Sequence, residues 1–291
     1  MAISDRKIRA MPFEILDTIS LPGNPLKPND DAFGHAESAA VVFDGATSLG
    51  DSLMPGDSDA AWLAHFGARR LMAHVRDGDA PLEALRHALA DAKKSFEALR
   101  RHAPKEKWQT PAASMMFVAD TPDGFDALAF GDCVALVHRP DKTIEVVGEA
   151  FTRKASESRR AAELAKKAGL APAGDLNRPE FLTALRAARN RLNSGSHWAF
   201  SPDPQAAEHV AQSHVAAPRE TIVLLASDGF LAIASDYGRY TAHTLMERAI
   251  AKGLGILADE LREIEDADPQ GHKHPRFKKC DDATAVLLKL V

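Results

Sequence analysis

The sequence predicts an α+β fold in which antiparallel strands form the core and helices cover them. Residues 113–147 contain four short stretches rich in β-forming side chains, joined by links of only a few residues. Links this short favour antiparallel pairing in a meander, because a parallel crossover needs a dozen residues or more. Two helical patterns, at residues 58–76 and 81–99, carry most of their large apolar side chains on one side, as helices that cover a sheet do.

The N-terminal part begins with a predicted strand at residues 13–19, followed by a loop rich in Pro, Gly and Asn at 21–29. The loop leads to two adjacent acids, Asp30 and Asp31. Such a pair is most often a solvated turn. Like charges this close repel one another unless they are solvated, separated or bound to metal, so the pair is also a candidate part of a site.

The next predicted strand, residues 39–43, is a continuous apolar run that stops at Asp44-Gly45. A short apolar run bounded by a turn signal is typical of a buried strand. The strand predicted at 221–227 ends in the same way, at Asp228-Gly229. Asp-Gly often only makes a turn, but two buried strands that both end so indicate one acidic site assembled from distant parts of the chain.

Helix-capping residues, Pro and Gly positions and local composition predict the remaining helices and the last strand. Asp57 or Ser58 is a suitable cap for the first helix, and Pro81 suits the first turn of the second. Residues 150–220 are the most polar part, so we expect an insertion or flap there, with helices at 156–168 and 178–192. The later helices are predicted at 241–252 and 255–266, and the last strand at 283–290.

Composition excludes several classes of function. The 291 residues carry a net charge of −5, with Lys and Arg spread along the chain, so no basic surface predicts binding to nucleic acid. No apolar run is long enough to span a membrane, and the N-terminus lacks the apolar core of a secretory signal. The two cysteines form neither a disulfide framework nor a zinc motif. We therefore expect a single-domain cytoplasmic protein over residues 1–291.

Acidic residues lie at the edges of the predicted strands. These are Asp30 and Asp31, Asp44, Asp132, Asp228, and Asp281 and Asp282. If the strand ends converge, divalent cations would remove the repulsion among the carboxylates, and oxygen-only ligands favour Mg²⁺ or Mn²⁺. A pair of such ions can bind a phosphate and lower the pKa of a water molecule between them to make a nucleophile.

Five motifs occur in a recognisable order. They read Asn29-Asp30-Asp31, Val42-Phe43-Asp44-Gly45, Phe130-Gly131-Asp132-Cys133, Leu225-Ala226-Ser227-Asp228-Gly229 and Asp281-Asp282-Ala283-Thr284-Ala285-Val286. This order resembles the metal-dependent type 2C protein phosphatase family (the PPM family), as a divergent member of bacterial type, over about residues 13–291. The resemblance implies a four-layer α-β-β-α sandwich of two stacked antiparallel sheets flanked by helices. It also implies hydrolysis of phosphoserine and phosphothreonine in proteins by a water activated by two Mn²⁺ or Mg²⁺ ions.

The resemblance also implies roles for particular residues. Asp44 would bridge both metal ions and the Gly45 carbonyl would contact one of them, while Asp228 and Asp281 would bind the other. Asp31 matches the acid of the first motif, and Asp30, beside it, would lie outside the ions and support their ligands. Asp132 matches the acid that helps to hold a third ion in some members.

The chain departs from the family pattern at three positions. Leu26 stands where the family usually has a phosphate-binding Arg, and Lys27 beside it is a weaker candidate for that role, since Lys lacks the bidentate fork. Ala46 follows Asp44-Gly45 where some members have the His proposed as general acid, so no side-chain general acid is identified. Ala232 replaces an acid common in the family, which argues against a third ion.

Three alternatives remain at this stage. The missing Arg and His would suit a pseudophosphatase that binds phosphoproteins without hydrolysis. Asp44-Gly45-Ala46-Thr47 could instead be a nucleophile motif of haloacid dehalogenase-like phosphatases, although that motif needs a second Asp and that fold needs parallel strands. Cys133 and Cys280 adjoin proposed metal-binding acids, so redox control is conceivable, but buried structural cysteines are far commoner.

Overall fold

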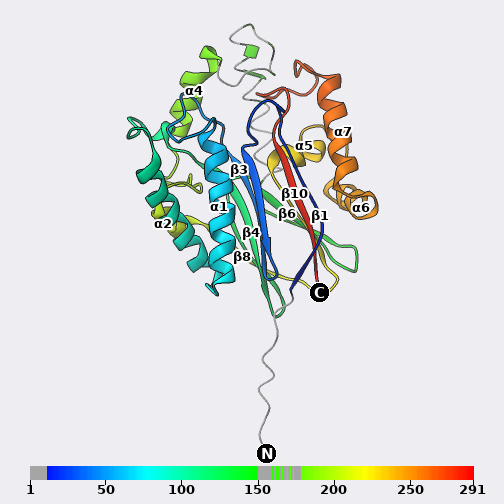
Figure 1. Ribbon diagram of the computed structural model, residues 1–291. Coiled ribbons are helices and arrows are strands. Elements are labelled where there is room, and N and C mark those ends of the chain that lie inside the picture. The colour runs from blue at the N-terminus through cyan, green and yellow to red at the C-terminus, as the bar shows by residue number, and fades with distance from the viewer. Residues whose placement is uncertain are drawn as a thin grey trace, which may run out of the picture.

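The computed structural model describes residues 12–149 and 178–291, together with residues 159, 162, 163, 165, 166, 169, 171 and 173. These residues form two antiparallel sheets of five strands each, stacked between two layers of helices (Figure 1). The predicted α+β class is confirmed, and so is the four-layer sandwich that the family resemblance implies.

The first sheet brings the two ends of the chain together in the strand order β1-β10-β9-β6-β7. Its strands are β1 (Phe13–Leu21), β10 (Ala283–Leu290), β9 (Ile222–Ala226), β6 (Val134–His138) and β7 (Ile144–Val147). Each of them lies within one or two residues of its predicted position. The antiparallel pairs exclude the dehalogenase-like reading of Asp44, which requires parallel strands.

The second sheet has the order β2-β3-β4-β5-β8. Its strands are β2 (Asp31–Ala36), β3 (Ala39–Gly45), β4 (Ala113–Thr121), β5 (Gly124–Phe130) and β8 (Ala211–Ala216). The sequence patterns missed β2 and β8, which are the two edge strands. An edge strand has a neighbour on one side only, and the first four residues of β8 are all exposed. Neither β2 nor β8 therefore shows a clear pattern of apolar residues.

The predicted meander at 113–147 is wrong in one respect. β4 pairs with β5 in the second sheet, whereas β6 pairs with β7 and β9 in the first, so the chain changes sheets between β5 and β6. The link is only three residues long, and Gly131 adopts a φ of 72° in it. A positive φ is readily available to Gly, and it redirects the chain where a short link would otherwise form a hairpin.

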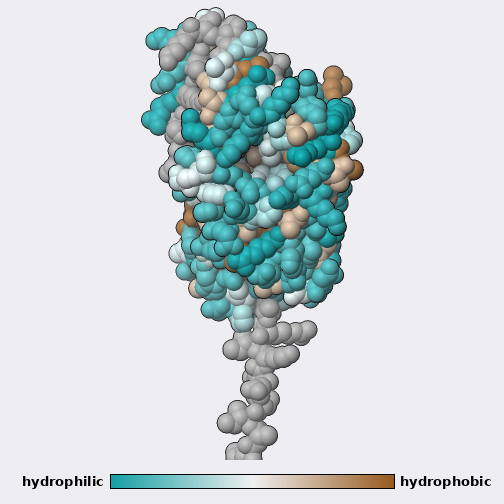
Figure 2. Space-filling view, turned by 90° about the vertical axis from the view of Figure 1, so that its left-hand side faces the viewer, coloured by the Kyte–Doolittle hydropathy of each residue, from teal (hydrophilic) through white to brown (hydrophobic). Residues whose placement is uncertain are grey.

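Helices cover the outer faces of both sheets. α1 (Asp59–Arg76) and α2 (Pro81–Leu99) pack on the second sheet at the predicted positions, and the Ser58 side chain caps α1 by accepting a hydrogen bond from Ala61 N–H. Seen from the left-hand side of Figure 1, the outer surface is mainly hydrophilic with scattered hydrophobic residues (Figure 2). α5 (Asp228–Ser235), α6 (Ala242–Lys252) and α7 (Leu254–Ala267) cover the first sheet.

α5 was not predicted from the sequence. Its residues 228–234 are all buried, so it lacks the apolar stripe by which a surface helix is recognised. β3 is also buried on both faces, which explains why its sequence is a continuous apolar run and does not alternate with polar residues. Alternate side chains of β3 pack against α1 on one face and against the first sheet on the other, as Val41 and Val42 do.

The stretch 150–220 combines elements of different kinds. The helix predicted at 156–168 lies largely outside the described residues, and the one predicted at 178–192 is α4 (Pro179–Arg189). The stretch also contains the short 3₁₀ segment η2 (Pro204–His209), whereas η1 (Lys107–Gln109) lies earlier in the chain, before β4. Strand β8 closes the stretch. The single-domain boundaries and the flap remain predictions. Among the described residues, no helix is both long and apolar enough to cross a membrane.

The crossing at Gly131 can be tested by Gly131→Ala. An added Cβ would lie 2.2 Å from Ser114 Oγ, and the backbone has a φ unfavourable to Ala, so we expect a loss of about 1–3 kcal/mol in the free energy of unfolding, measured by urea denaturation. Gly78→Ala is the matched control, because Gly78 also has a positive φ of 96° but nothing lies within 4 Å of the added atom. Equal losses in both variants would contradict the steric argument.

Candidate metal centre

The second sheet brings two predicted acids face to face. Asp31 begins β2 and Asp44 lies near the end of β3, and the register pairs them directly. On the next strand, Ser114 of β4 lies opposite Asp44. Directly paired residues of an antiparallel sheet point to the same face, so the three side chains lie in a row at one end of the sheet.

The first sheet contributes acids at the same end. Asp228 follows the end of β9, and the strands on either side, β6 and β10, run antiparallel to β9 and therefore begin beside it. Asp132 precedes β6 and Asp281 precedes β10. The carboxylates of Asp44, Asp132 and Asp228 each offer an oxygen within 4.8 Å of the others. The fold thus gathers acids that lie nearly 200 residues apart in the chain.

The buried carboxylates are costly as anions. Asp31 is 1% exposed, and its Oδ2 is buried without a hydrogen-bond partner among the described residues. Burial, followed by the charges of neighbouring acids, raises the pKa of both Asp31 and Asp44 well above the ordinary range. An unpartnered buried oxygen within a group of carboxylates suits a divalent cation, and the oxygen-only donor set fits Mg²⁺ or Mn²⁺. The residues present therefore fit the ions that the family resemblance implies.

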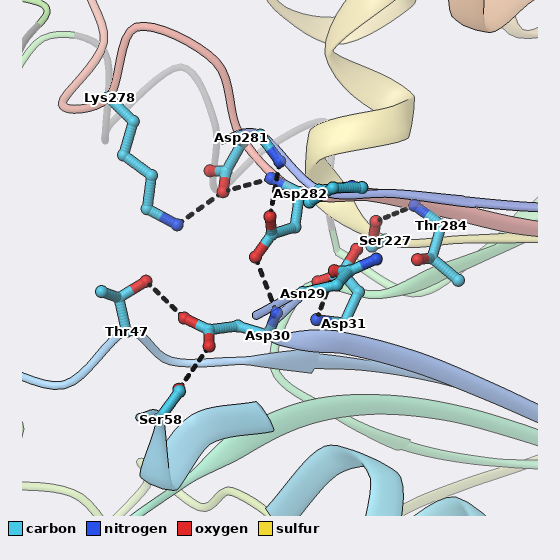
Figure 3. Close-up of polar contacts among 12 residues, drawn as sticks. Asn29, Asp30, Asp31, Thr47, Ser58, Ser227, Lys278, Asp281, Asp282 and Thr284 are labelled. Carbon is cyan, nitrogen blue, oxygen red and sulfur yellow. Dashed lines mark hydrogen bonds and ion pairs between the residues drawn. The ribbon is translucent and has the colours of Figure 1, made fainter. Parts of the chain in front are cut away.

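Asp30 and Asp282 hold the loop that carries the first acids. The Asp282 carboxylate accepts hydrogen bonds from the backbone N–H groups of Gly23 (2.6 Å) and Asp30 (2.8 Å). The Asp30 carboxylate in turn accepts from the hydroxyls of Thr47 and Ser58 (Figure 3). Each of these two acids accepts hydrogen bonds that join strands and loops, and the supporting position of Asp30 beside the ions remains a prediction.

Two glycines allow the backbone to close around the acids. A Cβ on Gly45 would lie 2.4 Å from the Asp30 carbonyl oxygen, and one on Gly229 would lie 2.0 Å from the Asp282 carbonyl oxygen. These contacts are far shorter than any real Cβ contact, so the Asp-Gly pairs serve close packing of the backbone at the end of the sheets.

Comparison with known proteins identifies the family. The family model described as protein phosphatase 2C matches residues 26–247. The chain belongs to the protein phosphatase 2C family. The comparison with curated proteins gave no match.

Three solved structures show the same fold at low identity. A PPM Ser-Thr phosphatase of Mycobacterium smegmatis, MsPP, is 16% identical, with a TM-score of 0.55, over 95% of this chain and 99% of that one. The PstP catalytic domain in complex with two manganese ions is 14% identical, with a TM-score of 0.55, over 97% and 99%. PppA of Pseudomonas aeruginosa, described as a regulatory component of a T6SS, is 14% identical, with a TM-score of 0.55, over 97% and 100%.

The phosphatase 2C fold of this chain has a cavity of about 670 Å³ beside the acids. Asp44, Asp132, Asp228 and Asp281 are among its lining residues, whereas Lys27 is not. Lys27 is an exposed loop residue, and Leu26 beside it is 91% exposed. The cationic side chains that line the cavity come from other elements, and they include Arg189, Arg191, Arg276 and Lys278.

No sequence pattern singled out these four cations, and Arg189, in the last turn of α4, lies next to the motif of Asp44 through its hydrogen bonds. Its guanidinium donates long hydrogen bonds to the carbonyl oxygens of Ala46 (3.3 Å) and Thr47 (3.4 Å), directly after Asp44-Gly45. Burial lowers the pKa of Arg189 to about 10 while Asp44 acts in the opposite direction, so the group remains charged at neutral pH. The only available signal was a helix ending in two arginines, Arg186 and Arg189, which is common in solvated helices.

Lys278 differs from Arg189 because it is already paired. Its ammonium forms an ion pair of 2.5 Å with Asp281 and extends toward the acids (Figure 3). Burial alone would lower the pKa of Lys278, but the Asp281 carboxylate outweighs it and raises the pKa above the ordinary value. The lysine therefore stays charged and offsets part of the negative charge of the centre.

Metal loading should stabilise the fold. Mn²⁺ or Mg²⁺ binding relieves repulsion among Asp31, Asp44 and Asp228, so we expect the melting temperature to rise with metal and to fall again with a chelator. Asp44→Asn should be at least as stable as wild type without metal, because one buried charge is gone, and should gain much less on loading. Differential scanning calorimetry measures both. An undiminished metal-induced shift in Asp44→Asn would contradict the assignment of Asp44.

Proposed function

We propose that this chain is a metal-dependent phosphomonoesterase that removes phosphate from phosphoserine or phosphothreonine in proteins. The observation that carries the proposal is the convergence of Asp44, Asp132, Asp228 and Asp281 from both sheets at one cavity, with Asp31 paired to Asp44 across β2 and β3. Membership of the protein phosphatase 2C family supports it. The similar fold of PstP, whose structure contains two manganese ions, supports a centre of two ions, Mn²⁺ or Mg²⁺.

Both sheets supply proposed ligands to the ions. Asp44 and the Gly45 carbonyl, from the second sheet, would share the ions with Asp228 and Asp281, from the first, and Asp31 supplies the buried oxygen beside Asp44. When bound, two such ions supply a nucleophilic water and neutralise phosphate oxygens. Asp132 would hold a third ion only together with a further acid. The family position for that acid is Ala232, so we propose two ions.

We propose further that Arg189 supplies the phosphate contact that Leu26 cannot make. Arg189 lines the cavity next to Asp44, and among its described contacts no carboxylate occupies the guanidinium. A partly buried guanidinium binds a phosphate through two parallel N–H donors, which is stronger and more directional than a lysine contact. α4 would thereby bring a guanidinium to the phosphate from a part of the chain far from the first motif.

A pseudophosphatase is the second candidate function. Ala46 stands where some family members have the His that is proposed as their general acid. This candidate predicts metal binding and phosphopeptide binding without turnover. Calorimetry with a phosphothreonine peptide, run beside an activity assay on the same sample, distinguishes the two functions.

The hydrolytic proposal is tested with an aryl phosphate and a phosphothreonine peptide, each with Mn²⁺ and with chelator. We expect turnover that needs the metal and falls about a hundredfold or more in Asp44→Asn, because the carboxylate that would hold both ions is lost. Asp123→Asn is the matched control, since Asp123 lies in the exposed turn between β4 and β5. Wild-type turnover in Asp44→Asn would overturn the bridging role. Absence of turnover in the wild type, with metal binding intact, would favour the pseudophosphatase.

The role of Arg189 makes a separate prediction. Arg189→Ala should raise KM for both substrates by about tenfold or more, since a charged hydrogen bond contributes about 1.5–3 kcal/mol, and Arg189→Lys should restore only part of the loss. Lys27→Ala should leave KM unchanged, because Lys27 does not line the cavity. Steady-state kinetics separate KM from kcat. If Lys27→Ala raised KM more than Arg189→Ala did, the phosphate contact would be assigned to Lys27 in the N-terminal loop instead.

A further inference from the structure

A second group of metal-ligand side chains lies where α1 joins α2. His74 is in the last turn of α1, Asp79 is in the connecting loop and His87 is on α2. Asp79 Oδ2 lies 2.7 Å from His87 Nδ1 and 3.3 Å from His74 Nδ1, and one ligand atom from each residue lies within 4.8 Å of the other two.

Asp91 fixes the orientation of the His74 ring from the other side. His74 Nε2 lies 2.9 Å from Asp91 Oδ2, and Arg70 Nε donates to the same oxygen at 2.7 Å. Burial would raise the pKa of Asp91, but the hydrogen bonds from His74 and Arg70 outweigh it and lower the pKa, so this group is a carboxylate at neutral pH. In a neutral His74 whose Nε2–H donates to Asp91, the lone pair of Nδ1 faces the Asp79 carboxylate.

Two acceptors in contact need a cation between them. A second proton on His74 is one solution, and a metal ion is the other. In a tetrahedral zinc site with bonds of about 2.0–2.1 Å, neighbouring ligand atoms lie roughly 3.3 Å apart. The distance from His74 Nδ1 to Asp79 Oδ2 is already 3.3 Å, and the distance of 2.7 Å from His87 Nδ1 to Asp79 Oδ2 needs to open by about 0.6 Å. A histidine ligand whose other nitrogen donates to a carboxylate is also the usual arrangement at protein metal sites.

This cluster is distinct from the acidic centre. Ser58, at the start of α1, contacts Asp30 beside the centre, whereas His74 lies 16 positions further along the helix. At 1.5 Å per residue, that separation is about 24 Å. In Figure 1 the α1–α2 link lies at the lower end of the helix layer and α4 at the upper end. An ion at the cluster would therefore contact no group of the catalytic cavity.

We propose that His74, Asp79 and His87 bind a divalent transition-metal ion of the zinc class, with Asp91 as the partner that orients His74. Imidazole ligands favour Zn²⁺ and related ions over Mg²⁺, whereas the oxygen-only acidic centre favours Mg²⁺ or Mn²⁺, so the two sites select different metals. The His87 side chain is 52% exposed, which leaves room for water as the fourth ligand. The bound ion joins α1, α2 and their connecting loop, and so stabilises the helix layer that packs against β3.

The test is calorimetric titration of the full chain with Zn²⁺ in excess Mg²⁺, which occupies the acidic centre. We expect one zinc site that weakens at least tenfold in His87→Ala and about 10–100-fold in Asp91→Asn, where only the orienting partner changes. Asp44→Asn should retain this site. His243→Ala is the matched control, because His243 is a half-exposed helical histidine beside a single carboxylate, Glu247.

The outcomes separate a metal site from an ion-pair cluster. Equal zinc affinity in wild type, His87→Ala and Asp91→Asn would overturn the proposal, as would zinc binding that is lost only in Asp44→Asn. Absence of zinc binding in the wild type would leave the cluster as a set of hydrogen-bonded ion pairs and would also overturn it. Circular dichroism of each variant confirms that it is folded. The proposal does not depend on phosphatase activity.

Discussion

Mutual repulsion among carboxylates is the constraint on which the rest of this structure depends. Asp31 and Asp44 are paired across two strands, partly or fully buried, and faced by acids from the other sheet. The ionised carboxylates at these strand ends lower the stability of the fold, because burial and like charge both disfavour the anions. The fold offsets part of the cost with the Lys278 ammonium and with backbone and hydroxyl donors around the outer acids, and the proposed divalent ions would offset the rest.

The acids are positioned by packing on both faces of the sheets. Apolar side chains fill the space between the two sheets, so neither sheet can shift without disturbing the other. Asp282 binds the backbone of the N-terminal loop, and Gly45 and Gly229 let neighbouring carbonyl groups approach closely. Packing of this kind would hold the acids in place before any ion binds, as the proposed hydrolysis requires.

The proposed chemistry is divided among parts of the chain that are far apart. The ions would be held by the two sheets, and the phosphate by Arg189 on α4, which contacts the loop after β3. α1 would connect the centre to a chemically different site, since its cap Ser58 contacts Asp30 and its last turn carries His74. Oxygen ligands at one end of this helix and imidazole ligands at the other would let one molecule hold two classes of metal.

The sequence by itself determined the fold class, most of the strands and helices, and the order of the acidic motifs. These are local features, because a buried strand that ends in Asp-Gly or a helix capped by Ser58 is encoded within a few residues. Only the tertiary structure decided that the chain changes sheets at Gly131, that β2 and β8 form the edges, and that residues 228–235 are helical. Only tertiary structure brings Arg189 beside Asp44, more than 140 residues away, and joins His74, Asp79 and His87 around one point. Such contacts cannot be recognised in a single sequence, because the periodicity of apolar residues reports the local helix or strand and not the distant segment that it contacts.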